Sequence, residues 1–186
     1  MSDFDEVMRT RRSVGKVRGD AIDRSTVLEL IELATRAPNH HLNEPWRFVV
    51  VQGDGRRRLG EAHAAAFLRT HPDASTEALA REAARFMRAP VVIVAIVEPA
   101  ADDPVTRRED RDAVAAAVEN LLLGAHARGL GAMWRTGTMA DEPELLDALG
   151  VVAPQAVVAF IYLGHPAVDP PVRSRKPVAE VIHWFE

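Results

Sequence analysis

Cysteine is absent from this chain of 186 residues. Its absence excludes disulfides, thiolate nucleophiles, iron–sulfur clusters and cysteine-based zinc sites, and it agrees with a reducing compartment. Long apolar runs are also missing. Residues 91–97 are far too few to cross a bilayer, and the N-terminus shows no apolar segment typical of secretion. We therefore expect a cytoplasmic protein with no membrane partner.

Lysine and aromatic residues are scarce as well. Two lysines stand against 21 arginines, the formal net charge is −4, and aromatic residues make up 5% of the chain. Without a basic excess or a set of stacking rings, nothing indicates a nucleic-acid partner. Hydrophobic residues, at 47%, suffice for a full core, so we expect a single domain over residues 1–186.

The periodicity of apolar residues predicts an α+β fold with many helices and few strands. Residues 91–97 are apolar throughout, as expected for a central strand covered on both faces. We predict further strands at 47–52, which should be buried, 131–139 and 156–163, and helices at 3–9, 23–37, 56–69, 75–88, 111–128 and 141–150. The alanine-rich helices at 56–69 and 75–88 should pack together and take no part in chemistry.

A polar loop separates the predicted helix at 23–37 from the predicted strand at 47–52. Pro38 should end the helix, and between Pro38 and Pro45 lie Asn39, His40, His41, Asn43 and Glu44. A polar loop fixed between a helix end and a core strand suits a flat polar ligand. It is equally typical of an ordinary connection, and both interpretations stay open at this point.

Arg11, Arg12 and Ser13 follow the first predicted helix, where Gly15 and Gly19 should interrupt regular structure. A guanidinium fork can bind two oxygens of a phosphate, and a serine hydroxyl can donate a further hydrogen bond. The triplet is therefore a candidate anion clamp. The alternative is that it is solvated surface charge, as most arginine pairs are.

Residues 111–128 are apolar on more than one face, which is typical of a helix buried inside a domain or against a partner chain. Residues 178–185 form a separate apolar segment after a proline-rich connector. A segment of this kind often completes the sheet of a neighbouring chain. We therefore expect a homodimer with exchanged C-termini.

Motifs of several other enzyme classes are absent or in the wrong order. Gly124, Gly129 and Gly131 lie at a helix end before a strand, which reverses the dinucleotide-binding order. The sequence contains no Walker A sequence, nucleophile elbow or HExxH motif. The histidines do not occur at ligand spacing, so we expect no metal site. The helix dipole explains four acids near the start of the helix at 111–128, namely Asp102, Asp103, Glu109 and Asp110.

Four stretches, taken in order, resemble the nitroreductase family of FMN-dependent oxidoreductases. They are Arg11-Arg12-Ser13, RAPNHHLNEPWRF at 36–48, GAMWRTG at 131–137 and YLGHP at 162–166. Each stretch alone is weak, whereas four at the right separations over nearly the whole chain are specific. The chain is therefore identified as a member of this family.

The resemblance implies a small central antiparallel or mixed sheet flanked by helices, in an intertwined homodimer. A C-terminal arm, about residues 166–186, would reach the partner subunit. Tightly bound FMN would lie at the subunit interface, and NAD(P)H would be the electron donor, with residues 124–129 near the nucleotide. The implied reaction is ping-pong hydride transfer to nitro compounds, quinones or similar small-molecule acceptors.

The resemblance also implies which residues bind FMN. Arg11, Arg12 and Ser13 would hold the phosphate and the pyrimidine edge. Arg36 and His40 would reach the flavin from the other subunit. These five residues therefore come from two widely separated segments of the chain.

Four further residues are implied in the FMN site. Trp134, Arg135 and Thr136 would line the isoalloxazine and ribityl region. Arg175, from the basic cluster at 173–176, would touch the phosphate. Chemistry would be carried by N5 of the flavin, so the resemblance implies no catalytic side chain and no metal ligand.

Two residues depart from the family pattern. Glu44 stands where glutamine is usual, and Leu42 replaces a small polar residue. Glu44 either pairs with a nearby arginine such as Arg47 or stays unpaired near the flavin, where its charge would stabilise the oxidised cofactor. Two alternative functions stay open: another flavin reaction, such as enone reduction, dehalogenation or flavin processing, and flavin binding without turnover.

Overall fold

The computed structural model describes residues 4–171 and 174–186, and these contain six α-helices and four β-strands. The helices are α1 Phe4–Thr10, α2 Arg24–Ala34, α3 Asp54–Thr70, α4 Thr76–Ala83, α5 Pro104–Ala127 and α6 Pro143–Leu149. The strands are β1 Trp46–Gln52, β2 Val91–Val97, β3 Gly131–Arg135 and β4 Ala156–Gly164. Short 3-10 turns are η1 His40–Leu42, η2 Ala84–Arg88, η3 Thr138–Asp141 and η4 Val178–Glu180. Asp3, in the first predicted helix, lies outside the described residues.

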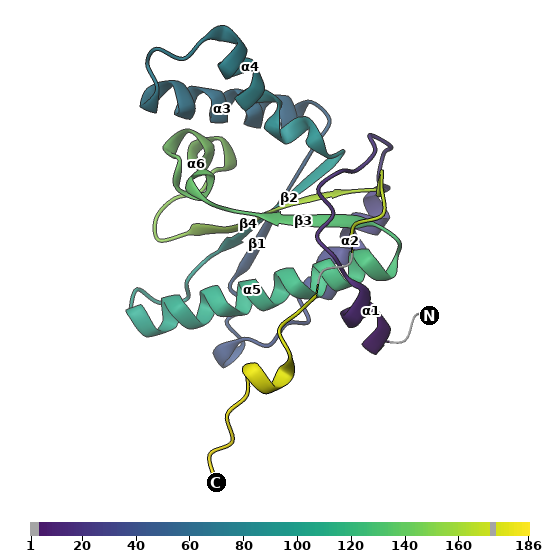
Figure 1. Cartoon of the computed structure of the whole chain (residues 1–186). Helices are drawn as coiled ribbons and strands as arrows, with labels where there is room; N and C mark the ends of the chain where they lie inside the picture. The colour runs from purple at the N-terminus through teal and green to yellow at the C-terminus, as the bar shows by residue number, and fades with distance from the viewer. Residues whose placement is uncertain (1–3, 172–173) are drawn as a thin grey trace.

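The four strands form one antiparallel sheet in the order β1-β2-β4-β3. Figure 1 shows α2 and α5 on one side of this sheet and α3, α4 and α6 on the other. The predicted α+β class and the sheet flanked by helices are therefore confirmed. The sheet separates two hydrophobic clusters.

Alternate side chains of β2 enter different clusters, because successive side chains of a strand point to opposite faces. Ile93 and Ala95 pack with α2 and α5, whereas Val92 and Val94 pack with α3, η2 and α6. All seven residues of β2 are buried, which confirms the prediction of a central strand.

Several element predictions need correction. The helix expected at 75–88 ends at Ala83 and continues as the 3-10 turn η2, and the strand expected at 131–139 ends at Arg135, before a turn at Gly137. The helix expected from residue 111 begins at Pro104, because the Asp103 side chain accepts hydrogen bonds from two backbone N–H groups of the first turn. The strand expected to be buried at 47–52 is the edge strand β1, which is mostly half-buried. Residue 142 rather than 141 precedes α6, because residues 138–141 form η3.

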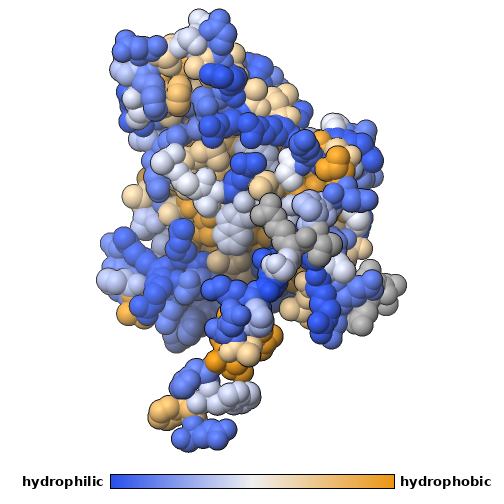
Figure 2. All heavy atoms as spheres, in the orientation of Figure 1, coloured by the Kyte–Doolittle hydropathy of each residue, from blue (hydrophilic) through white to orange (hydrophobic). Residues whose placement is uncertain are grey.

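The two ends of the chain meet the body at the β3 side of the sheet. Ser13 forms a parallel bridge with Ala132, and Val17 forms an antiparallel bridge with Pro166. The C-terminal arm then leaves the body, and Figure 2 shows apolar side chains exposed along it. Phe185 is 96% exposed. The contact of this arm with a partner subunit stays a prediction.

None of the helices in the described ranges is long and apolar enough to cross a membrane.

Candidate functional site

The triplet Arg11-Arg12-Ser13 follows α1 directly. The Nε of Arg11 lies 3.1 Å from a carboxylate oxygen of Glu119 on α5. Arg12 donates through Nη1 to the backbone carbonyls of Arg9 and Arg11, at 2.8 and 2.7 Å. Its Nε is buried and has no hydrogen-bond partner within the described residues. Buried donors are nearly always paired, so a buried N–H without a partner is unusual and calls for an acceptor that the single chain does not supply.

His126 on α5 lies beside the triplet. Its Nε2 is 2.8 Å from the hydroxyl oxygen of Thr10 at the end of α1. Burial, and then the positive charges of Arg11 and Arg12, lower the pKa of His126. The two arginines thus disfavour a positive charge on His126.

A cavity of about 440 Å³ opens where β3 ends. Ten residues line it: Arg85, Arg88, Met133, Trp134, Arg135, Thr136, Gly137, Thr138, Met139 and Tyr162. Trp134 and Arg135 are half-buried and Thr136 is exposed. The structure thus brings together the three residues of β3 and its following loop that the resemblance assigns to the flavin.

The triplet and this cavity share strand β3. Val14 donates its backbone N–H to the carbonyl of Ala132 at 2.9 Å, directly after the bridge between Ser13 and Ala132. A Cβ on Gly15 would lie 3.3 Å from the sulfur of Met133, so the chain approaches the cavity wall closely here. Arg11–Ser13 and Trp134–Thr136 therefore belong to neighbouring parts of one surface.

Arg36 and His40 lie away from that cavity. Arg36 lines a groove between α2 and α5 and forms an ion pair with Glu32 at 3.0 Å. His40 lines another cavity, beside α5, with its Nδ1 3.8 Å from Glu109. One chain does not bring these two residues to Trp134–Thr136, as expected if they serve the site of the other subunit.

The loop that carries His40 has an unusual backbone. His41, Leu42 and Glu44 all have positive φ angles, of 53°, 57° and 45°. Positive φ is uncommon outside glycine and has an energetic cost, so three cases within four residues need support from neighbouring groups. Such conformations concentrate at functional sites.

Asp110 supplies part of this support. It is fully buried on α5 and accepts hydrogen bonds from the Asn43 side chain at 3.0 Å and from the backbone N–H of Ala100 at 2.8 Å. The helix dipole therefore does not explain Asp110, which lies in the second turn of α5. Its role is to fix the loop at Asn43, and no motif in the sequence indicated this.

Glu44 is not paired with Arg47. Arg47 instead forms an ion pair with Glu98 at 3.0 Å and donates to the carbonyl of Gly150. The side chain of Glu44 is exposed, and it has no hydrogen-bond or ion-pair partner in the part of the chain that the structure describes. Its effect on a flavin stays a prediction.

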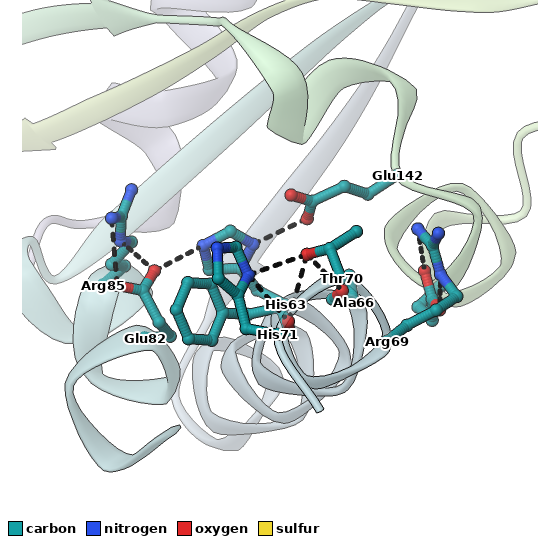
Figure 3. Close-up of polar contacts among 10 residues, drawn as sticks. His63, Ala66, Arg69, Thr70, His71, Glu82, Arg85 and Glu142 are labelled. Carbon is teal, nitrogen blue, oxygen red and sulfur yellow. Dashed lines mark hydrogen bonds and ion pairs between the residues drawn. The ribbon is translucent and has the colours of Figure 1, made fainter. Parts of the chain in front are cut away.

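A buried polar chain links α3, α4 and α6, where we expected packing alone (Figure 3). His63 is 3% exposed, with Nδ1 2.6 Å from Glu142 and Nε2 3.1 Å from Glu82. Glu82 also binds Arg85, with Nε at 2.5 Å, and Arg85 reaches the wall of the cavity at β3. Both ring nitrogens therefore lie within hydrogen-bonding distance of a carboxylate group.

Arg175 is exposed on the C-terminal arm, and no contact joins it to the triplet within the chain. Arg173, another member of the basic cluster predicted at 173–176, lies outside the described residues. The assignment of Arg175 to the phosphate therefore depends on the position of the arm in a dimer.

The sequence model of the nitroreductase family matches residues 8–165 of this chain. The protein belongs to the nitroreductase family, a class of oxidoreductases. The triplet, the loop at 36–48 and the cavity at β3 all lie within the matched region.

Three curated relatives align over most of the chain. YfhC of Bacillus subtilis is 29% identical over 94% of this chain and 90% of its own, and YdjA of Escherichia coli strain K12 is 29% identical over 87% of each. Both are named provisionally as NAD(P)H nitroreductases. The 5,6-dimethylbenzimidazole synthase of Rhodospirillum rubrum is 33% identical over 97% of this chain and 88% of its own.

Solved structures show the same fold. A nitroreductase-like protein from Bacillus cereus superposes with a TM-score of 0.89 at 28% identity, over 100% of this chain and 97% of that one. A provisionally named nitroreductase from Desulfovibrio desulfuricans was solved in complex with FMN. It superposes with a TM-score of 0.77 at 29% identity, over 100% of this chain and 98% of that one.

Proposed function

We propose that this protein is an FMN-dependent NAD(P)H oxidoreductase that passes electrons to nitro compounds, quinones or similar acceptors. The observation that carries the proposal is the buried, unpartnered Nε of Arg12, in a segment that bridges to β3, whose end lines a cavity with three arginines. The FMN bound to the Desulfovibrio relative and the names of YfhC and YdjA support it. The lack of cysteine supports a cytoplasmic location.

The residues present fit the phosphate end of FMN. A phosphate accepts hydrogen bonds from guanidinium groups, and Arg12 has an N–H without a partner next to a second guanidinium, that of Arg11. The Arg11 side chain is anchored by Glu119, which limits the rotamer freedom that binding would otherwise remove. Ser13 is exposed and can donate its hydroxyl.

The wall of the cavity at β3 fits the ring system. When bound, FMN would supply hydride and electron transfer, with donor and acceptor using the same site in turn. The half-buried Trp134 would exclude water from one side, and Arg135 and Thr136 would offer polar contacts. Arg36 and His40 would come from the second subunit, and Arg175 from the C-terminal arm.

A homodimer completes this site. The groove that contains Arg36 has a volume of about 550 Å³, and its other lining residues are Phe4, Val7, Leu33, Asn120, Leu123, Gly124, Ala127 and Arg128. Phe4 is 65% exposed, and the arm exposes further large apolar side chains. Apolar surface of this extent favours a partner chain. The last turn of α5 in this groove is also where residues 124–129 would meet the nucleotide.

The experiment compares Arg12→Gln with the matched control Arg9→Gln, whose side chain is exposed at the end of α1. Loss of a charge-assisted hydrogen bond should weaken FMN affinity about 10- to 100-fold, measured by fluorescence during dialysis. The control should retain parental affinity. Unchanged retention in both Arg11→Ala and Arg12→Ala would show that the triplet does not bind FMN.

The same preparation separates an enzyme from a flavin-binding protein without turnover. An oxidoreductase should lose its yellow colour when NADH or NADPH is added without oxygen, and should regain it when a nitro compound or quinone is added. Protein that stays yellow with both nucleotides is a binding protein only.

A further inference from the structure

The cavity at β3 is lined by three arginines and by no acidic residue. Arg85 and Arg88 enter it from η2, and Arg135 from the end of β3. By contrast, the cavity beside His40 is lined by two acids, Glu109 and Asp112. A concave wall that carries positive charge alone selects for anions.

The three arginines differ in how much of their charge is compensated, and Figure 3 shows the contacts of Arg85. Arg85 is held by Glu82 through two contacts, at 2.5 and 3.0 Å, and Glu82 is itself held by His63. Arg88 and Arg135 form no ion pair or hydrogen bond with any described residue. The network therefore neutralises Arg85 and leaves two guanidinium groups uncompensated.

Tyr162 also lines this cavity, next to Arg135. The guanidinium carbon of Arg135 lies 5.7 Å from the centre of the Tyr162 ring, which is a cation–π distance. Burial raises the pKa of Tyr162 to about 12, although Arg135, Arg88 and Arg85 act in the opposite direction. The phenol is therefore neutral near pH 7 and can donate a hydrogen bond.

We propose that Arg88 and Arg135 receive an oxyanion carried by one of the reactants: the carboxylate of an aromatic acceptor or a phosphate of the donor nucleotide. The inference rests on the proposed function and names the class of reactant. A guanidinium fork matches either oxyanion, and Trp134 and Met133 supply the apolar wall for an aromatic ring.

The first test uses two acceptors of similar shape and different charge, 4-nitrobenzoate and 4-nitrobenzamide. The measured quantity is the ratio of their kcat/KM values in the flavin-loaded enzyme, corrected for FMN content. Arg88→Gln and Arg135→Gln should each lower the benzoate-to-benzamide ratio about 10-fold, mainly through KM, because each loses a charge-assisted contact. Arg58→Gln, a surface control outside the cavity, should leave the ratio within about twofold.

A second test repeats the comparison with NADPH and NADH, which differ by one phosphate. A fall in the NADPH-to-NADH ratio, with an unchanged acceptor ratio, would assign the oxyanion to the donor. A direct readout is calorimetric titration of the oxidised protein with benzoate and with benzamide, where the variants should lose benzoate binding selectively.

Two outcomes would overturn the inference. If both members of each pair change equally while FMN is lost, the arginines bind the cofactor. If the ratios hold and light scattering shows dissociation, they serve the subunit contact. Failure of the proposed function is distinguishable, because the parent protein would then lack FMN or would not be bleached by either nucleotide.

Discussion

Among the described residues, one face of the sheet buries Asp110 on α5 and the other buries His63 on α3, and the partners of these two side chains are of opposite kinds. Asp110 accepts hydrogen bonds from neutral donors, the amide of Asn43 and a backbone N–H. His63 lies between two carboxylates. A charge held by dipoles stays local and fixes one loop. The contacts of His63 instead continue from one element to the next, because Glu82 also binds Arg85 at the cavity wall.

Removal of the histidine should have the larger effect. His63→Leu would leave Glu82 and Glu142 facing an apolar side chain, and breaking a buried ion pair by removing one partner costs about 3–5 kcal/mol. Urea unfolding should show this loss of free energy. His63→Gln keeps one donor and should lose less. A loss below about 1 kcal/mol in His63→Leu would mean that the carboxylates are satisfied without the histidine.

Removal of the Asn43 side-chain amide should lower the free energy of unfolding by less. Asn43→Ala leaves Asp110 with the backbone N–H of Ala100 as its remaining donor, which should cost about 1–3 kcal/mol in the same unfolding measurement. The control is Asn120→Ala, because the Asn120 amide makes only a 3.4 Å contact with the carbonyl of Leu33. Equal losses in the two variants would contradict the assigned role of Asp110.

His126 provides a third case to set beside Asp110 and His63, because the charges that act on it are those of two arginines, Arg11 and Arg12. Its folded-state pKa is lowered from 6.5 by burial and by Arg11 and Arg12, so folding opposes its protonation. The resulting stability is present above pH 6.5 and is lost as the pH falls further. Between pH 7.5 and 5.5 the parent should lose slightly more stability than His126→Gln, measured as the shift in urea midpoint. A larger loss of stability in His126→Gln than in the parent would mean that folding raises the pKa of His126, contrary to this prediction.

The sequence predicted what depends on local pattern. The apolar run at 91–97 predicted the buried β2, and the two prolines around residues 39–44 predicted the loop before β1. It did not predict Asp110 or His63 as buried centres, because one partner of each, Asn43 and Glu142, lies 67 and 79 residues away along the chain. A histidine or aspartate on a helix looks the same in sequence whether it is solvated or buried.

The candidate site likewise contains residues that were predicted from local motifs and residues that only the tertiary structure brings together. The triplet and the residues of β3 were predicted from motifs, and the structure places them side by side through the bridge between Ser13 and Ala132. Arg85 and Arg88 were missed, because η2 is positioned at the cavity by its packing on α3, which is far from β3 in the sequence. The pairing expected between Glu44 and Arg47 was wrong, because Arg47 turns toward Glu98.

The detached C-terminal arm has a consequence for mass action. If Arg175 on one arm and His40 on another chain complete each flavin site, then separating the subunits dismantles both sites at once. Anything that binds the assembled state alone shifts the equilibrium toward it, so free FMN would promote pairing and dilution would release the cofactor. Flavin content per chain would then fall with protein concentration. Trp184, 74% exposed in the single chain, would report the same transition by its fluorescence.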